Sequence, residues 1–172
     1  WTAAAASTDG LSAARAARRG GRVRDRGARE RGAHDFDTNL VVEAGAGSGK
    51  TSLLIEHVLC QMLARGLDVD GFAAITFTEK AAAEMRKRLA SALAELAELA
   101  GKRVPPEQVG EATEAMRAYR WLSLAQSPES IADTAKRRLA SIVAAEVSTI
   151  HGFCAGLLRR FPLEAGVDPR FS

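Results

Sequence analysis

The stretch between residues 44 and 52 combines closely spaced glycines with a lysine and a threonine, residue types that can hold phosphate groups. It reads AGAGSGKTS and closely follows the pattern Gly-x-x-x-x-Gly-Lys-Ser/Thr. Glycine lets backbone N–H groups turn toward an anion, the Lys50 ammonium can reach the β- and γ-phosphates, and the Thr51 hydroxyl can hold Mg²⁺. Lys50 and Thr51 are therefore the candidate catalytic residues, and Thr51 is also the candidate metal ligand. The candidate nucleotide-binding residues are Ala44, Gly45, Ala46, Gly47, Ser48, Gly49, Lys50, Thr51 and Ser52.

The sequence on both sides of this loop decides between a phosphate-binding loop and an ordinary Gly/Ala loop. A short apolar strand is predicted over Leu40–Glu43, and a helix over Lys50–Arg65, where apolar residues recur at helical spacing until Gly66. A helix that begins at Lys50 adds free N–H groups and the positive end of its dipole to the loop. Strand, loop and helix in this order favour a site for a nucleoside triphosphate.

Two further strand–helix units follow along the chain. A second apolar strand is predicted over residues 72–77, followed by a long helix from Glu79 to about Ala100 with Thr78 as its N-cap. The remaining predicted segments are helices over Glu107–Ala125 and Pro128–Val143 (with Ser127 as N-cap), a strand over Glu146–Thr149 and a helix over Ile150–Phe161. Three strand–loop–helix units predict an α/β fold with a parallel sheet, flanking helices and right-handed crossovers, incomplete at its C-terminal side.

Composition is typical of a soluble globular protein, but charge is unevenly distributed along the 172 residues. No run of 18 apolar residues predicts a membrane span. Residues 1–34 carry eight arginines and three acidic residues, a net charge of +5. We expect them to form a disordered or weakly helical Ala/Arg/Gly tail, with a short helix over Asp25–Ala33. Residues 35–172 have a net charge of −2, so the basic pI gives no argument that this domain binds DNA.

The two cysteines, Cys60 and Cys154, lie far apart in apolar helical segments. Neither belongs to a Cys-x-x-Cys pair, so a zinc site is not supported. We expect both to be buried free thiols in a reducing compartment, and the protein to be cytoplasmic.

Polar side chains and an aromatic ring accompany the ends of both later strands. The residues are Thr76, Phe77, Thr78, Ser148, Thr149, His151 and Phe153. Ligands of an open parallel sheet bind beyond the carboxyl ends of its strands, and this combination suits a nucleic-acid phosphate with a base to stack. The structural alternative is local: Thr78 is only a helix cap, the phenylalanines belong to the core, and His151 is a surface imidazole.

Three segments together resemble the opening motifs of superfamily 1 DNA helicases of the UvrD/Rep/RecB group. Residues 45–51 (GAGSGKT) resemble motif I, residues 73–89 (AAITFTEKAAAEMRKRL) resemble motif Ia, and residues 147–171 (VSTIHGFCAGLLRRFPLEAGVDPRF) resemble motif Ib of the RecB/AddA helicase–nuclease branch. The resemblance covers about residues 35–171 and implies a P-loop NTPase (RecA-like) fold that binds ATP and Mg²⁺ through Lys50 and Thr51. It also implies contacts to single-stranded DNA from Thr76, Phe77, Thr78, Lys80, Thr149, His151 and Phe153.

The chain departs from the family pattern at two positions and lacks one feature. Glu79 stands where the family usually has Asn, and Arg26 stands roughly where a Gln that reads adenine is expected. The sequence contains no adjacent pair of acidic residues, so the Mg²⁺-holding acid of a later motif has no counterpart. We therefore expect residues 35–172 to be the N-terminal part of helicase ATP-binding domain 1A, which binds ATP but hydrolyses it poorly by itself.

The sequence thus predicts part of an ATP-dependent DNA helicase that translocates on single-stranded DNA. One form would be a helicase–exonuclease of recombinational repair, whose partner would be a second helicase/nuclease subunit. Two alternatives stay open: a P-loop ATPase or kinase that does not act on DNA, and a non-catalytic nucleic-acid-binding module. The first predicts an ATPase rate that single-stranded DNA leaves unchanged, and the second predicts that Lys50→Ala has no effect on any activity.

Overall fold

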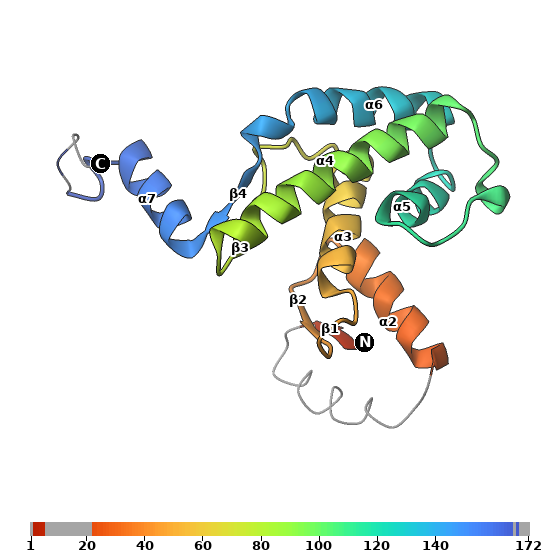
Figure 1. Cartoon of the computed structure of the whole chain (residues 1–172), viewed down its shortest axis with the longest axis horizontal. Coiled ribbons are helices and arrows are strands. Elements are labelled where there is room, and N and C mark those ends of the chain that lie inside the picture. The colour runs from red at the N-terminus through yellow and green to blue at the C-terminus, as the bar shows by residue number, and fades with distance from the viewer. Residues whose placement is uncertain (1, 6–21, 167, 169–172) are drawn as a thin grey trace.

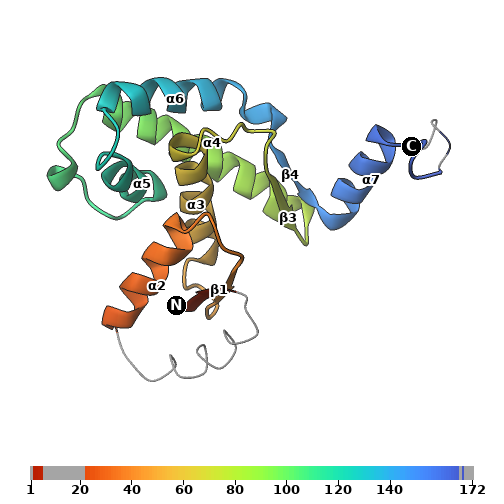
Figure 2. The ribbon, with the colours of Figure 1, turned by 180° about the vertical axis from the view of Figure 1, so that it is seen from behind.

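The computed structural model describes residues 2–5, 22–166 and 168 of the chain. Most of this part is helical, and short strands join the helices (Figures 1 and 2). In chain order the elements are β1 (Thr2–Ala5), α2 (Arg22–His34), β2 (Leu40–Glu43), α3 (Lys50–Ala64), β3 (Ala73–Thr76), α4 (Glu79–Gly101), the 3₁₀ turn η2 (Pro106–Gln108), α5 (Glu114–Leu122), α6 (Pro128–Ala140), the 3₁₀ turn η3 (Ile142–Ala144), β4 (Glu146–Thr149) and α7 (Ile150–Arg160).

Helix α4 is long and lies at the centre of the core. Its first turn is capped by Thr78, whose side-chain oxygen accepts a hydrogen bond from the backbone N–H of Ala81 at 3.1 Å, so the predicted N-cap is confirmed. The buried side chains of Leu89, Leu93 and Leu96 recur at helical spacing. Helix α6 runs alongside α4 on one side, and α3 and α5 pack against it on the other (Figure 1).

Helix α3 joins the loop after β2 to this core. It ends at Ala64, one residue earlier than predicted, and Gly66 follows with a φ of 69°, the left-handed conformation in which helices commonly terminate. Leu59 and Met62 on α3 are fully buried and belong to the same apolar cluster as Tyr119 of α5. The α3 helix therefore links the glycine-rich loop directly to the most buried part of the molecule.

The sheet differs from the predicted one. Strands β3 and β4 pair in parallel, with Thr76 opposite Thr149, as expected for strands joined by helical crossovers. Strand β2, however, pairs antiparallel with β1, with Thr2 opposite Glu43, and among the described residues it has no ladder with β3 or β4. The prediction of one parallel sheet holding all three strands is therefore wrong for β2, because an extended segment far upstream supplies its hydrogen-bond partner.

Further helix boundaries also differ from the predictions, most clearly those of α5 and α6. Helix α5 begins at Glu114 because Thr113 caps it, accepting from the N–H of Met116 at 3.2 Å, while the preceding prolines and Gly110 keep that segment irregular. Helix α6 ends at Ala140 and passes into η3 rather than continuing to Val143. The predicted cap at Ser127, with Pro128 in the first turn, is confirmed.

Helix α2 occupies part of the segment predicted to be a tail. The short helix expected there is present and longer than predicted, and it packs against α3 through the buried small side chains of Ala28 and Ala33. The placement of the domain boundary at residue 34 stays a prediction. Among the described residues, no helix combines the length and the apolar character needed to span a membrane.

The two thiols have different environments. Cys60 on α3 is buried, as predicted, whereas Cys154 on α7 is exposed, so the prediction for Cys154 is wrong. The reason is that α7 has no buried residue among those described. The apolar side of α7 therefore gave a misleading indication of burial.

Candidate functional site

The P-loop (residues 44–52) has the backbone conformation that its glycines allow. Gly47 and Gly49 have φ values of 71° and 84°, a region that residues with a Cβ rarely adopt. Gly49 is the N-cap of α3, so the first N–H groups of this helix open directly onto the loop. Such free N–H groups, together with the positive end of the helix dipole, form a binding site for an anion such as phosphate.

The Lys50 side chain folds back across the P-loop. Its ammonium donates hydrogen bonds to the carbonyl oxygens of Ala44 and Gly45 at 2.6 and 2.8 Å, and the Ser48 hydroxyl donates to the Gly45 carbonyl at 2.6 Å. Ala44 stands at the position of the first glycine of the motif pattern, and its carbonyl still takes part in holding the lysine. The arrangement places a positive charge over the loop.

The fit of a magnesium ion depends on Thr51. This residue is exposed in the first turn of α3, beside Lys50. Among the described residues, no group of three or more His, Cys, Asp or Glu side chains gathers as a metal site. One hydroxyl still suits Mg²⁺ in a nucleotide site, because this ion takes several ligands from phosphates and water. Thr51 would hold the ion, and the ion would neutralise phosphate charge when bound.

The end of β3 presents one aromatic ring and one lysine. Phe77 is fully exposed (100%), so the alternative that it belongs to the core is wrong. The Thr76 hydroxyl donates to the carbonyl of Thr78 at 3.0 Å, and the Thr78 hydroxyl oxygen caps α4. The hydroxyls of both threonines thus form hydrogen bonds within the protein, whereas the side chains of Phe77 and Lys80 are exposed.

The end of β4 is built in the same way. The buried Thr149 accepts from the N–H of Gly152 at 3.1 Å, which caps α7, and its hydroxyl donates to the Glu79 carboxylate at 2.8 Å. His151 is exposed and Phe153 is half-buried. The Thr149–Glu79 bond joins α7 to α4, so Glu79 has a structural partner at the position where the family pattern has Asn.

The structure brings two of the three predicted polar clusters together. The pairing of β3 with β4 places both strand ends side by side; we call their candidate contact residues the strand-end surface, namely Thr76, Phe77, Thr78, Lys80, Thr149, His151 and Phe153. The P-loop does not join them, because β2 belongs to a different sheet. It lies at the opposite end of α3 from α4 (Figures 1 and 2). The expectation that all three clusters share one sheet edge is therefore wrong.

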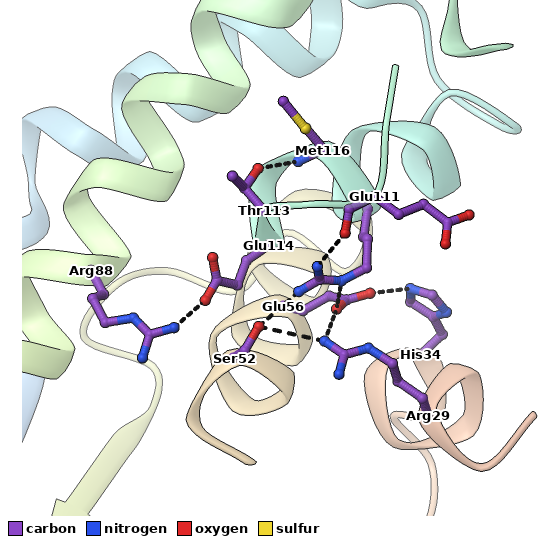
Figure 3. Close-up of polar contacts among 10 residues, drawn as sticks. Arg29, His34, Ser52, Glu56, Arg88, Glu111, Thr113, Glu114 and Met116 are labelled. Carbon is purple, nitrogen blue, oxygen red and sulfur yellow. Dashed lines mark hydrogen bonds and ion pairs between the residues drawn. The ribbon is translucent and has the colours of Figure 1, made fainter. Parts of the chain in front are cut away.

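A buried ionic network next to the P-loop was not predicted. Glu56 of α3 is only 3% exposed and accepts from Arg117 Nε at 2.6 Å and from an Arg29 guanidinium nitrogen at 3.1 Å. His34 Nε2 lies 3.9 Å from the same carboxylate (Figure 3). Arg117 also donates to the Ser52 hydroxyl at 2.8 Å. The one sequence signal was a glutamate on the apolar face of α3, since a buried charge requires partners.

Burial sets the proton affinities of this region. Desolvation lowers the pKa of His34 and of His57 below the ordinary histidine value, although the nearby Glu56 carboxylate raises the pKa of His34 in part. Both imidazoles are therefore neutral at neutral pH. Desolvation, and to a smaller degree the Glu56 charge, raises the pKa of the Cys60 thiol far above its usual value.

Two cavities flank the P-loop helix. The larger, about 680 Å³, lies between α2 and α5 and is lined by Arg26, Arg29, Glu56, Glu111 and Trp121 among others. The smaller, about 440 Å³, is lined by Lys50 together with residues of α2, β2 and α3. The larger cavity lies away from the P-loop glycines, and most of its charged side chains are bound to one another. The assignment of phosphate binding to the P-loop stays a prediction.

Comparison with known proteins gives one family. The sequence model of the UvrD/REP helicase N-terminal domain matches residues 26–172. The chain is 36% identical over 137 residues to an ATP-dependent helicase/nuclease subunit from Desulforudis audaxviator, and 34% identical over 137 residues to the protein of the same name from Desulforamulus reducens. Each match covers 78% of this chain and 9% of the relative, so the chain spans about a tenth of the length of these curated relatives.

Proposed function

Because the chain belongs to the UvrD/REP helicase N-terminal domain family, we propose that it is the ATP-binding part of a helicase that moves along single-stranded DNA. The observation that carries this proposal is the P-loop. There, two left-handed glycines and the Lys50 ammonium surround the space before the first turn of α3. Family membership supports ATP as the nucleotide.

Binding of ATP would change the bonds of Lys50. Its ammonium now donates to the Ala44 and Gly45 carbonyls, and in the bound state it would direct donors to the β- and γ-phosphates. The N–H groups at the start of α3 would bind phosphate oxygens, and Thr51 would hold Mg²⁺. Phosphoryl transfer depends mainly on such positioning and on charge stabilisation, so Lys50 and Thr51 are the residues to which we assign catalytic roles.

The strand-end surface is the proposed contact with DNA. Phe77 offers an exposed ring on which a base can stack, Lys80 offers a charge for a phosphate, and His151 lies on the neighbouring strand end. The threonines of this surface would act mainly by holding α4 and α7 in place.

The names of the relatives suggest the larger setting. Those proteins are named as subunits of an ATP-dependent helicase/nuclease. We propose that this chain works in a cytoplasmic enzyme of the same kind, which has a role in DNA repair and contains a second helicase/nuclease subunit.

Binding of fluorescent oligo-dT to the full-length protein tests the DNA assignment. We expect Phe77→Ala to weaken binding about 5- to 150-fold, because stacking of one base on an aromatic ring contributes about 1–3 kcal/mol. Leu124→Ala removes another highly exposed apolar side chain (82% exposed), just after α5, and should leave the affinity unchanged. Equal affinities for Phe77→Ala and wild type would contradict the assignment, and a rate of ATP hydrolysis unaffected by oligo-dT would favour an ATPase that does not act on DNA.

A further inference from the structure

Helix α5 packs against two helices: α3, which follows the P-loop, and α4, which begins at the strand-end surface. Two of its side chains, Glu114 and Arg117, are three residues apart and therefore lie on the same face of the helix. We call this pair the α5 bracket. Its two members form ion pairs with different helices, Glu114 with α4 and Arg117 with α3.

Arg117 binds α3 at the last residue of the P-loop, Ser52, and one turn further along the helix at Glu56. Its guanidinium donates through Nε to the Glu56 carboxylate at 2.6 Å and through another nitrogen to the Ser52 hydroxyl at 2.8 Å. The side chain of Arg117 is mostly buried, and Glu56 has almost no exposed surface. Ser52 directly follows Thr51, so a buried, charge-assisted contact holds the first turn of the P-loop helix to α5.

Glu114 binds α4 through an ion pair with Arg88, whose guanidinium donates to the carboxylate (Figure 3). Burial opposes ionisation of Glu114. Bonds from its own backbone N–H, from Arg88 and from the Ser52 hydroxyl outweigh this, and lower the pKa of the Glu114 carboxyl. The carboxylate is therefore charged at neutral pH. The same Ser52 hydroxyl contacts both members of the α5 bracket.

Helix α4 in turn follows β3 in the chain and is bound to β4. Arg86 donates to the Val147 carbonyl of β4 at 2.6 Å, and Glu79 accepts from the Thr149 hydroxyl at 2.8 Å. A shift of α4 along or about its axis would therefore move β4 and the start of α7 with it. Lys80 lies on α4 itself, so its ammonium would move as well.

We propose that the α5 bracket couples nucleotide binding at the P-loop to the position of α4, and through α4 to nucleic-acid binding at the strand-end surface. This inference rests on the proposed function, since it requires that the P-loop binds ATP and that the strand-end surface binds single-stranded DNA. Glu114, Arg117 and Arg88 are positioning residues in this account, because none of them touches either ligand.

The bonds of Lys50 provide the change that the bracket would transmit. Its ammonium holds the Ala44 and Gly45 carbonyls, and phosphate oxygens would compete for the same donors. Exchange of these bonds alters the loop immediately before Ser52. A ligand shifts such an equilibrium only through contacts that differ between the two states, and these lysine bonds differ.

The coupling is measured as a ratio of dissociation constants. The Kd of a fluorescent ATP analogue for the full-length protein is determined with and without saturating oligo-dT. We expect the two constants to differ about 5- to 150-fold in the wild type, a usual range for coupled sites. Glu114→Gln keeps the size of the side chain but removes the charge that pairs with Arg88. It should bring the ratio of the two dissociation constants close to one. The Kd measured without DNA should stay within about twofold of wild type, and general destabilisation would not produce this combination.

Two further variants complete the experiment. Adding Arg88→Gln to Glu114→Gln should cause no further loss, because both substitutions remove the same ion pair. Glu129→Gln is the matched control: it removes the exposed ion pair between Arg103, just after α4, and α6, and should keep the wild-type ratio.

Three outcomes would overturn the inference. One is a wild-type ratio in Glu114→Gln, and another is an equal loss in Glu129→Gln. The third is a wild-type protein that binds both ligands independently; this result would contradict the coupling but agree with the proposed function. A wild-type protein that binds neither ATP nor oligo-dT would contradict the proposed function itself.

Discussion

The P-loop and the strand-end surface are held in place by different kinds of interaction. The P-loop begins α3, in which eight residues are buried, among them Leu53, Leu59 and Met62. His151 and Phe153 lie on α7, which has no buried residue among those described and is bound through its cap at Thr149. The nucleotide end is therefore fixed by apolar packing, whereas part of the DNA-facing end is fixed by a few hydrogen bonds. Segments of the second kind open more readily.

The two cysteines test this difference with the largest expected effect, because Cys60 lies on α3 and Cys154 on α7. The thiolate is the reactive form; burial raises the pKa of Cys60 and also blocks access to it. We expect a small alkylating reagent at neutral pH to modify Cys154 at least about 10³-fold faster, since Cys60 requires an opening that costs several kcal/mol. Peptide mass spectrometry over time gives both modification rates. Similar rates would contradict the conclusion that α3 is more firmly held than α7.

A pair of leucine truncations gives the next largest effect. Leu59→Ala on α3 removes a fully buried side chain and should lower the free energy of unfolding by about 2–5 kcal/mol. Leu157→Ala on α7 removes a side chain that is 42% exposed and should cost less than about 1 kcal/mol. Urea denaturation measures both values. A large cost for Leu157→Ala would show that α7 is packed against the body in solution.

Removal of the α7 cap should have a smaller and local effect. Thr149→Val keeps the shape of the side chain but leaves the Gly152 N–H and the Glu79 carboxylate without their partner. We expect a loss of about 0.5–2 kcal/mol, the usual value of an N-cap. Hydrogen exchange should become faster in α7 and stay unchanged in α3. Faster exchange in α3 as well would contradict the conclusion that the two helices are held in place independently.

Local sequence patterns predicted much of this arrangement correctly. Strands β2 and β4, the start of α3 and the caps at Thr78 and Ser127 follow from residues close together in the chain, and the structure confirms them. Capping and glycine-dependent turns are local effects, so the residue types at those positions are sufficient to predict them.

Contacts between distant residues could not be predicted in the same way. The partners of Glu56 lie 27 and 61 residues away, at Arg29 and Arg117, and no spacing rule connects them. The pairing of β2 with β1 likewise depends on residues that are far apart in the chain. Cys154 was misjudged in burial, and the alternative that placed Phe77 in the core is wrong, because an apolar type does not state whether another element covers the side chain.

The most direct test of the account is ATP binding by Lys50→Ala, measured by titration calorimetry on the full-length protein. Loss of the charged donor should weaken ATP binding about 10- to 100-fold, since a hydrogen bond to a charged group contributes about 1.5–3 kcal/mol. Lys136→Ala, which removes an exposed lysine from α6, should bind ATP as the wild type does. Equal ATP affinities for wild type and Lys50→Ala would contradict the assignment of the P-loop as the nucleotide site.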